Sequence, residues 1–383
     1  MFVVFLLLLW GSLLFPPAAY YVWMLMRIRR RNVSVSVNFA YQPYVTLIVP
    51  TYNEATVIAK KLENINELDY PENKLQVIII DSSSIDGTLD EVKTFLNKTN
   101  FRFQIILLSE KERLGKSHAL NVALKYSAGE IIATSDADSF WEKDALKKAV
   151  SYFADPSIGA VTGKEELINL RRGVYTLSEG VYRKFYYNLR LGESIIHSTL
   201  IFQGELALYR RTAFEEFEDA PGYSDDIGTV INIVSRGYRC IFIPEAIFYD
   251  TAAFSFRGRL RVKSRRSEHL VSGIIKSLKL KIKGRLPVMW RIIFFNFYLH
   301  VISPILLTLA ILATAILYFV NFNSLWFLGL FFILLLIKKL RVFLISYITG
   351  NLALILGLIP FITGKRSNVW KKVDEMRLKN YNF

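Results

Sequence analysis

The order of apolar and polar residues along the chain begins with a long uncharged run. Residues 2–26 carry no charge, and a basic cluster of Arg27, Arg29, Arg30 and Arg31 follows at once. About 20 apolar residues are enough for a helix to cross the hydrocarbon core, and positive charge marks the cytoplasmic end. The pattern predicts a transmembrane helix over residues 1–27, with the N-terminus outside. A cleaved signal peptide is disfavoured because the charges follow the run rather than precede it.

A second apolar region covers residues 292–364. Residues 292–320 are uncharged and long enough to span, and a polar break at 321–324 separates them from a shorter run, 325–337. Residues 342–364 form a further uncharged run, before a basic tail, 365–383. If all three runs span, the tail lies outside; if 342–364 is re-entrant or interfacial, it is cytoplasmic. The positive-inside rule favours the cytoplasmic tail. The residues that would permit such a break are Gly350, Asn351, Gly357 and Pro360.

The middle of the chain, residues 42–256, alternates between two patterns. Short apolar runs at 45–49, 75–80, 103–108 and 131–134 have the length of buried strands, and helical patterns lie between them at 54–68, 89–96 and 116–127. This rhythm predicts an α/β domain with a doubly wound, mostly parallel sheet. Ligands bind such sheets at the carboxyl ends of the strands. Those ends carry polar clusters: Asn53 and Glu54, Asp81, and Asp136-Ala-Asp138.

Composition narrows the class of protein. The single cysteine and four histidines exclude a disulfide scaffold and a cysteine-based zinc site within one chain, and they disfavour a polyhistidine metal site. One cysteine also agrees with a cytoplasmic catalytic domain. The 14% of aromatic residues excludes a disordered chain. Neither G-x-G-x-x-G nor a Walker A motif is present, which disfavours a dinucleotide oxidoreductase or a P-loop nucleotidase.

Positive charge is concentrated in residues 257–291. This segment carries twelve basic residues against one acid, Glu268, in a chain with 48 Lys and Arg against 33 Asp and Glu. Residues 276–285 lie beside the next apolar run, where attraction to anionic lipid headgroups is expected. Residues 261–266 lie nearer the folded domain and could clamp a diphosphate. Nucleic-acid binding is the usual interpretation of high basicity, but the adjacent bilayer explains the charge more simply, so no nucleic-acid partner is predicted.

Two pairs of carboxylates are candidates for chemistry. Asp136 and Asp138 point to the same side of an extended chain, where their mutual repulsion would be relieved by Mg²⁺ or Mn²⁺ with a bound phosphate. A solvated turn that caps the next helix is the alternative. Asp225-Asp226 precedes a helical pattern at 227–236. Asp226 could act as a general base, but on local grounds a cap by Ser224 or Asp225 is favoured. Asp86-Gly87 is interpreted as a turn with Asp86 as a helix cap.

Together these segments resemble the family-2 glycosyltransferases, specifically the membrane-integrated branch of cellulose, chitin, hyaluronan and poly-N-acetylglucosamine synthases. Six motifs occur in family order. The first four are Val49-Pro-Thr-Tyr-Asn-Glu54, Asp81-Ser-Ser-Ser-Ile-Asp-Gly-Thr88, Leu114-Gly-Lys-Ser-His-Ala-Leu-Asn121 and Ser135-Asp-Ala-Asp138. The last two are Gln203-Gly-Glu-Leu-Ala-Leu-Tyr-Arg-Arg211 and Ser224-Asp-Asp226. The order and spacing of the six motifs outweigh the local pattern and favour a catalytic interpretation of Asp226.

The resemblance implies a nucleotide-sugar donor, with a UDP-sugar favoured, and inversion at the anomeric carbon. It implies Asp226 as general base and a divalent ion, Mg²⁺ or Mn²⁺, held by Asp136 and Asp138. The acceptor would be a glycan or a lipid-linked hydroxyl. Donor binding would involve Thr51, Asn53, Glu54, Asp81, Lys116, Asp136, Arg265 and Arg266. The acceptor side would comprise Gln203, Gly204, Glu205 and Asp225.

The chain departs from the family pattern at two places. The processive synthases end the domain with Q-x-x-R-W, whereas Lys263-Ser-Arg-Arg266-Ser267 keeps only the arginine, and Asp225 replaces the glutamate of T/S-E-D. The missing tryptophan disfavours synthesis of long polymers. Two alternatives remain: a lipid-phosphate glycosyltransferase, whose anionic acceptor needs no base, and a membrane protein with a non-catalytic nucleotide-binding domain. The predicted location is the cell membrane, with the catalytic domain in the cytoplasm.

Overall fold

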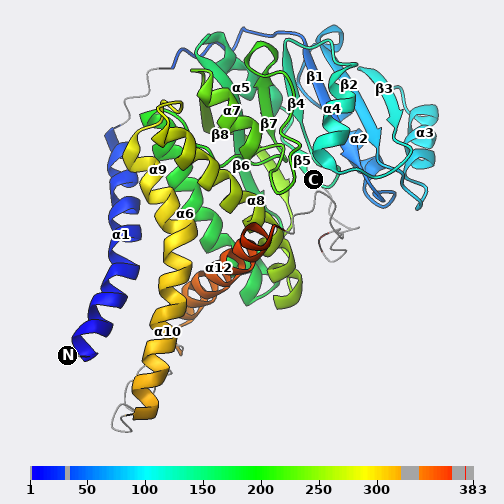
Figure 1. Ribbon diagram of the computed structural model, residues 1–383. Helices are drawn as coiled ribbons and strands as arrows, with labels where there is room; N and C mark the ends of the chain where they lie inside the picture. Colours follow the sequence, from blue (N-terminus) through cyan, green and yellow to red (C-terminus); the bar gives the residue numbers. More distant parts are fainter. Residues whose placement is uncertain (1, 31–34, 321–335, 365–375, 377–383) are drawn as a thin grey trace.

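The computed structural model describes residues 2–30, 35–320, 336–364 and Met376. An α/β domain occupies the middle of the chain, and long helices from both ends of the chain extend away from it (Figure 1). Helix α1 (Phe2–Arg30) precedes the domain, and helices α9 (Trp290–Phe297), α10 (Ser303–Val320) and α12 (Lys338–Thr363) follow it. A π-helical turn, Tyr298–Ile302, joins α9 to α10.

One eight-stranded sheet forms the centre of the domain, in the order β3-β2-β1-β4-β7-β6-β8-β5. Strands β1 (Val45–Thr51), β2 (Leu75–Asp81), β3 (Gln104–Ser109) and β4 (Ile131–Thr134) are parallel. Strand β7 (Ala207–Arg210) runs antiparallel to β4 and β6 (Ile158–Leu167), and β8 (Arg239–Asp250) is parallel to β6. Strand β5 (Phe140–Trp141) closes the edge against β8. The predicted α/β class is confirmed, as a mixed sheet.

Helices cover both faces of the sheet because the central strands are apolar on both sides. Every residue of β2 and β4 is buried, as expected for strands covered on two faces. Helices α2 (Ile58–Asn66), α3 (Thr88–Lys98) and α5 (Ala145–Val150) pack on one face. Helices α4 (Lys116–Leu124) and α7 (Ile227–Ser235) pack on the other. Short 3-10 turns occur at 72–74, 151–154, 170–172 and 211–213.

The expected helix over 54–68 begins four residues late, at Ile58. Asn53 has a positive φ of 55°, a conformation that ends regular structure and that asparagine tolerates better than most residues. Backbone N–H groups of this turn donate to the side chains of the next βα loop, at Ser84, Asp86 and Thr88. Asp86 therefore braces two loops, and Gly87 rather than Asp86 occupies the cap position of α3.

Two further long helices connect the sheet to the apolar ends. Helix α6 (Val174–Ile196) packs against α1 and α12, and α8 (Phe256–Ile282) packs against α7, α9 and α12. Three segments of the described chain are long and apolar enough to cross a membrane: Val4–Arg30, Trp290–Ile316 and Lys338–Thr363. Helix α10 leads away from the sheet and α12 returns toward it (Figure 1).

Helix α12 is continuous through the residues expected to permit a break. A side chain at Gly357 would come within 2.7 Å of the α8 backbone at Ser267 and Glu268, so this glycine allows the two helices to touch. The predicted run 325–337 lies largely outside the described residues, as does the tail 365–383 except for Met376. The Met376 carbonyl accepts a hydrogen bond from Thr251, directly after β8.

The basic residues of α8 find acidic partners on other elements. Glu179 of α6 lies 3.2 Å from Arg259 and 3.1 Å from Lys263. Burial alone would raise the pKa of Glu179, but these cations outweigh it and the pKa is lowered. Lys276, predicted to face lipid headgroups, pairs with Glu218. Counting the single acid within residues 257–291 therefore underestimates how far their positive charge is neutralised, because the acidic partners lie elsewhere in the sequence.

Candidate active site

The ends of β1 and β2 form a polar platform of four predicted donor-binding residues. The Thr51 hydroxyl donates to Asp81 at 3.0 Å, and Asp81 also accepts from the backbone and hydroxyl of Ser84. Asn53 accepts from the Ile85 N–H at 2.9 Å, and the Glu54 N–H donates to Thr88. Asp81 and Glu54 are buried. The parallel register of β1 and β2 therefore brings the first two motifs together.

Lys116 is the central cation of the site. It begins α4 after Gly115, whose φ of 117° few other residues could adopt. Its Nζ lies 2.7 Å from Asp136 Oδ1 and 3.4 Å from Asp225 Oδ2. Burial alone would raise the pKa of Asp136, but the Lys116 ammonium outweighs it and the pKa lies below its usual value. Burial raises the pKa of Asp225, against the opposing effect of Lys116.

Asp226 itself caps α7, so the expectation that Ser224 or Asp225 does so is wrong. Its Oδ1 accepts from the Ile227 N–H at 2.6 Å and from the Ser224 hydroxyl. Both donors use Oδ1, and no hydrogen bond to Oδ2 is found among the described residues, so Oδ2 could receive a partner in the cavity that Asp226 lines. Burial raises the pKa of Asp226 above its usual value, and the Ser224 hydrogen bond opposes that rise.

The segment before β7 brings three predicted acceptor-side residues to the same place. Gln203 donates to Glu165 of β6 at 2.5 Å, and Glu205 pairs with Arg266 of α8 at 2.7 Å. Gly204 lies between them, and a side chain there would come within 3.0 Å of Lys116 Nζ. Its lack of a side chain keeps space open beside the central lysine.

A cavity of about 230 Å³ joins many of these groups. The predicted residues that line it are Lys116, Asp136, Gln203, Gly204, Glu205, Asp225, Asp226, Arg265 and Arg266. Thr51, Asn53, Glu54, Asp81 and Asp138 are not among its lining residues. The structure thus brings Lys116 and Asp136 of the donor side against the acceptor-side group, with the β1–β2 platform beside them.

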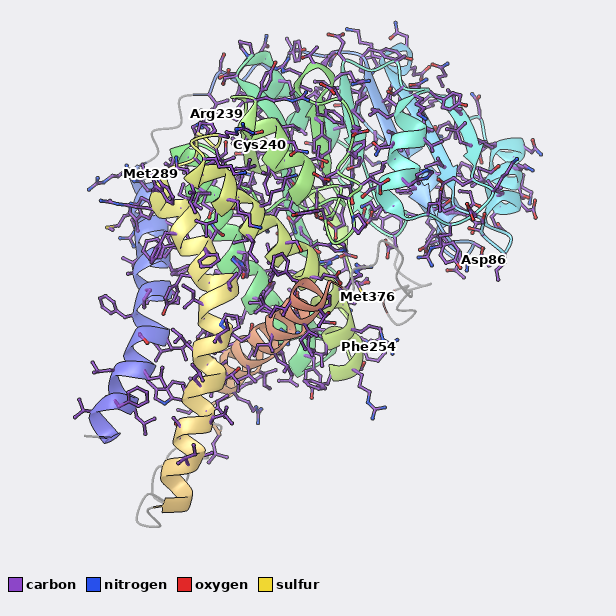
Figure 2. All side chains as sticks on the ribbon, viewed as in Figure 1. Asp86, Arg239, Cys240, Phe254, Met289 and Met376 are labelled. Carbon is purple, nitrogen blue, oxygen red and sulfur yellow. The ribbon has the colours of Figure 1, made fainter. Side chains whose placement is uncertain are left out.

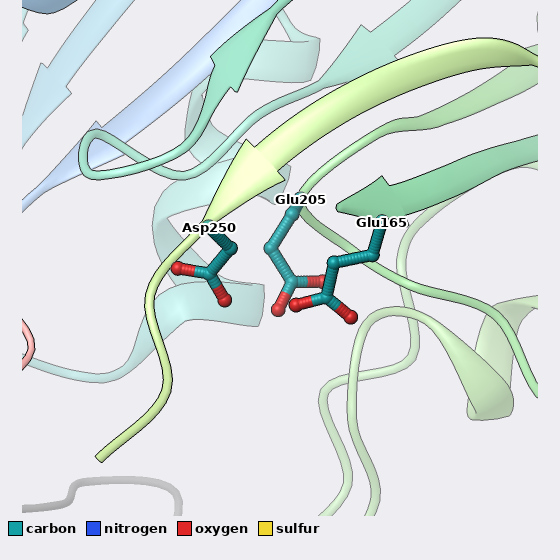
Figure 3. A group of neighbouring side chains, drawn as sticks. All are labelled: Glu165, Glu205 and Asp250. Carbon is teal, nitrogen blue, oxygen red and sulfur yellow. The ribbon is translucent and has the colours of Figure 1, made fainter. Parts of the chain in front are cut away.

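Three further carboxylates, Glu165, Glu205 and Asp250, gather beside the cavity with ligand atoms within 4.8 Å of one another (Figure 3). Arg183 pairs with Glu165, and Arg266 pairs with Glu205. Burial and the nearby Asp138 raise the pKa of Asp250 to about 7. Two of these carboxylates, Glu165 and Glu205, are thus paired with arginines, as Asp136 is paired with Lys116.

Sequence reasoning missed Lys61, which is 1% exposed beneath the Asp136 loop. Its Nζ donates to the Ser135 hydroxyl at 2.6 Å and the Ser139 carbonyl at 2.7 Å, and burial lowers its pKa to about 7. A signal was present in the sequence. Lys61 follows Val57 and Ile58 and precedes Leu62 and Ile65 at the spacing of the apolar face of a helix, so its place among them indicated a buried lysine.

Helix α6 contributes a second set of cavity residues that sequence reasoning missed. They repeat at intervals of three or four residues, which places them on one face of the helix. The set is Glu179, Tyr182, Arg183, Tyr186 and Arg190. Burial raises the pKa of Tyr182 to about 12 and lowers the pKa of Arg190 to about 10. His269 of α8 also lines the cavity, and burial lowers its pKa.

Comparisons with a family model and with curated proteins both identify similarity to glycosyltransferases. The model of the family "Glycosyl transferase family 2" matches residues 46–217. A probable glycosyltransferase, YdaM of Bacillus subtilis, is 28% identical over 267 residues, which cover 68% of this chain and 62% of that protein. An N-acetylglucosaminyltransferase of Bradyrhizobium diazoefficiens is 27% identical over 58% of this chain and 48% of its own length. The chain thus spans about half to three fifths of these two relatives.

Among solved structures, the mannosyltransferase PcManGT from Pyrobaculum calidifontis, in complex with GDP-Man and Mn²⁺, aligns with a TM-score of 0.83. It is 32% identical, and the alignment covers 96% of this chain and 100% of that one. The likeness therefore includes the terminal helices as well as the α/β domain. From this match and the family model, the chain belongs to glycosyltransferase family 2.

Proposed function

We propose that the protein is a membrane-bound inverting glycosyltransferase that moves one sugar from a nucleotide-sugar donor to a hydroxyl of a glycan or lipid-linked acceptor. The observation that carries the proposal is the cavity in which Lys116 and Asp136 lie against Asp225 and Asp226. This geometry supports the proposal because a cation and a carboxylate proposed for the donor side lie beside a carboxylate that could accept a proton.

Transfer requires that the bond between the anomeric carbon and the diphosphate breaks while the acceptor oxygen attacks from the opposite face. The departing diphosphate takes the bonding electrons, and Lys116, Arg265 and Arg266, which line the cavity, would stabilise its charge. Asp226 takes the proton of the acceptor hydroxyl through its free carboxylate oxygen. Attack opposite to the leaving group inverts the anomeric configuration.

Asp136 and Asp138 would hold the divalent ion, Mg²⁺ or Mn²⁺. Two carboxylates two residues apart provide the hard oxygen ligands that these ions prefer. The ion would supply charge compensation to the diphosphate. PcManGT, solved with GDP-Man and Mn²⁺, supports this assignment by similarity. It also supports GDP-mannose as a donor to test beside the UDP-sugars favoured by the motifs.

The membrane assignment rests on the three candidate spans and on the cluster Arg27, Arg29 and Arg30 at the end of α1. The positive-inside rule puts that end, and the α/β domain after it, in the cytoplasm. The contact between Met376 and Thr251 supports a tail on the side of the α/β domain. The basic segment 257–291 is proposed to lie at the interface.

A donor panel tests the function. Purified protein in lipid, with Mn²⁺ or Mg²⁺, is given UDP-Glc, UDP-GlcNAc, UDP-Gal, UDP-GlcA and GDP-Man, and release of nucleoside diphosphate is measured with and without membrane lipid extract. Metal-dependent release from one donor, increased by lipid extract, is expected. Folded protein that releases nucleoside diphosphate from none of these donors under either condition would favour the non-catalytic alternative.

A further inference from the structure

Arg190 of α6 carries a buried positive charge at the wall of the cavity. The residue is 5% exposed and lines the cavity together with Tyr186 and Gln203. Its Nε has no hydrogen-bond partner among the described residues. Its guanidinium lies over the face of the Phe242 ring, 5.0 Å from the ring centroid. A ring face attracts a cation weakly, but it is not a conventional hydrogen-bond acceptor for the five N–H groups of a guanidinium. Glu205 and Glu193 act on its charge, but neither forms an ion pair with it among the described residues.

The neighbouring arginines differ from Arg190 because each has a carboxylate partner within ion-pair distance. Arg259 pairs with Glu179, Arg183 with Glu165, and Arg266 with Glu205. A buried charge without a partner is strongly destabilising unless something compensates it. Arg190 forms no ion pair within the part of the chain that the structure describes, yet it reaches a cavity. An anion in that cavity would supply the missing partner.

The position of Arg190 indicates the source of the anion. One turn further along α6, Glu193 accepts from Tyr20 of α1 at 2.5 Å and from Asn296 of α9 at 2.7 Å. One turn earlier, the Tyr186 hydroxyl lies 2.9 Å from the His300 ring. Arg190 therefore lies between the cavity and two of the candidate membrane spans.

The partner of Glu193 on α1 lies close to the basic end of that helix. Tyr20 precedes Arg27, the first charge of this end, by seven residues, which is about 10 Å along a helix. Positive charge at the end of a span is expected at the lipid headgroups, so this side of α6 is near the headgroup end of α1. An anion bound beside the spans at this end belongs to a lipid more readily than to a solute.

We infer that Arg190 binds the phosphate group of a lipid-linked acceptor, while a sugar hydroxyl of the same acceptor lies at Asp226. The inference rests on the proposed function and names its acceptor class. In this arrangement the phosphate positions the acceptor and does not react. The bonds broken and formed remain those of transfer to the hydroxyl.

Binding of geranyl phosphate to the full-length protein tests the inference without turnover. Mn²⁺ with UDP or GDP occupies the donor side, so that the probe reports on the rest of the cavity. Wild type, Arg190→Gln and Arg190→Lys are compared, with Lys184→Gln as the matched control, since Lys184 is exposed on the same helix. Geraniol and inorganic phosphate are the neutral and the lipid-free probes.

We expect wild type, Lys184→Gln and Arg190→Lys to bind geranyl phosphate, and Arg190→Gln to bind it at least tenfold more weakly, as loss of a charge-assisted contact implies. Geraniol should bind all four proteins equally. Equal binding of geranyl phosphate by wild type and Arg190→Gln would overturn the inference. So would inorganic phosphate that competes as strongly as geranyl phosphate, which would identify a soluble anion.

The lysine variant keeps the test valid if Arg190→Gln does not fold, because Arg190→Lys retains charge but loses the forked geometry. It should bind geranyl phosphate between twofold and tenfold more weakly than wild type, and binding equal to that of geraniol would contradict a charge-based site. Sugar transfer onto the phosphate of geranyl phosphate itself would also overturn the inference, since the phosphate would then be the nucleophile. Absence of turnover with any donor would count against the proposed function and leave this binding result unaffected.

Discussion

At the scale of single residues, the site is organised by how carboxylates are compensated. Asp136 is held ionised by Lys116, whereas burial raises the pKa values of Asp225 and Asp226. The pKa values of carboxylates in one cavity are thereby shifted in opposite directions, which is the usual way that neighbouring acids acquire different roles. The ionised Asp136 suits a cation, and Asp226, with the higher proton affinity, suits a base.

The Ser224→Ala variant tests this division at Asp226. The Ser224 hydroxyl donates to the Asp226 carboxylate and lowers its pKa, so its removal should raise that pKa further. The base works only when deprotonated, and activity is lost as pH falls through its pKa. The acid limb of the rate profile should therefore move to higher pH, with the plateau little changed. An unmoved limb, or one moved to lower pH, would contradict the assignment of Asp226.

Some residues of the cavity were predictable from the sequence because a motif marked them. Lys116, Asp136 and Asp226 stand in ordered motifs, and the structure brings them to one cavity. Arg190 and Lys61 belong to no motif, and their importance depends on burial and on partners remote in sequence. The apolar spacing around Lys61 indicated a buried position, but it could not show which neighbours would compensate the charge.

At the scale of elements, the contact between α8 and α12 fixes part of the cavity. Helix α8 carries Arg265, Arg266 and His269, all of which line the cavity. Gly357 lets α12 approach the α8 backbone directly. Strands β1 to β4 were predictable because each is a compact apolar run, whereas β5 to β8 were not predicted. The helix contact was not predictable either, since an apolar run does not show which helix it will pack against.

Gly357→Ala tests the helix contact, with Gly350→Ala as its matched control. A Cβ at Gly357 would lie 2.7 Å from α8 backbone atoms, whereas one at Gly350 would lie 3.8 Å from the Tyr182 ring. Overpacking costs about 1–3 kcal/mol, so Gly357→Ala should lower the unfolding temperature and reduce transfer. Gly350→Ala should match wild type in both measurements. Equal effects of the two substitutions would show that the close approach is not needed.

At the scale of the whole molecule, three helices long and apolar enough to cross a membrane lie beside the α/β domain, which underlies the proposed membrane location. The long helices extend from one side of the domain (Figure 1), and Met376 lies near that domain (Figure 2), hydrogen-bonded to Thr251 directly after β8. The apolar runs predicted the existence of the helices. The direction of α12 could not be predicted by counting charges, because it depends on packing against α6 and α8.

Cysteine labelling tests the proposed topology. The single native thiol, Cys240, is buried in β8 (Figure 2), so it should give little background with an impermeant maleimide. A cysteine in place of the exposed Val4 should be labelled in intact cells. A cysteine in place of the exposed Thr363 should be labelled only after the cells are opened. Labelling of the Thr363→Cys variant in intact cells would place the end of α12 outside.

The most direct test of the central claim is the Asp226→Asn variant, measured for transfer and for donor binding in the same preparation. Asparagine caps helices as well as aspartate does, so α7 should remain intact while the base is lost. Transfer should fall by about 10²–10⁴-fold, the usual contribution of a general base, and donor binding should stay within about twofold of wild type. Near-normal transfer by the folded variant would show that Asp226 is not the base and would favour an acceptor that is already an anion.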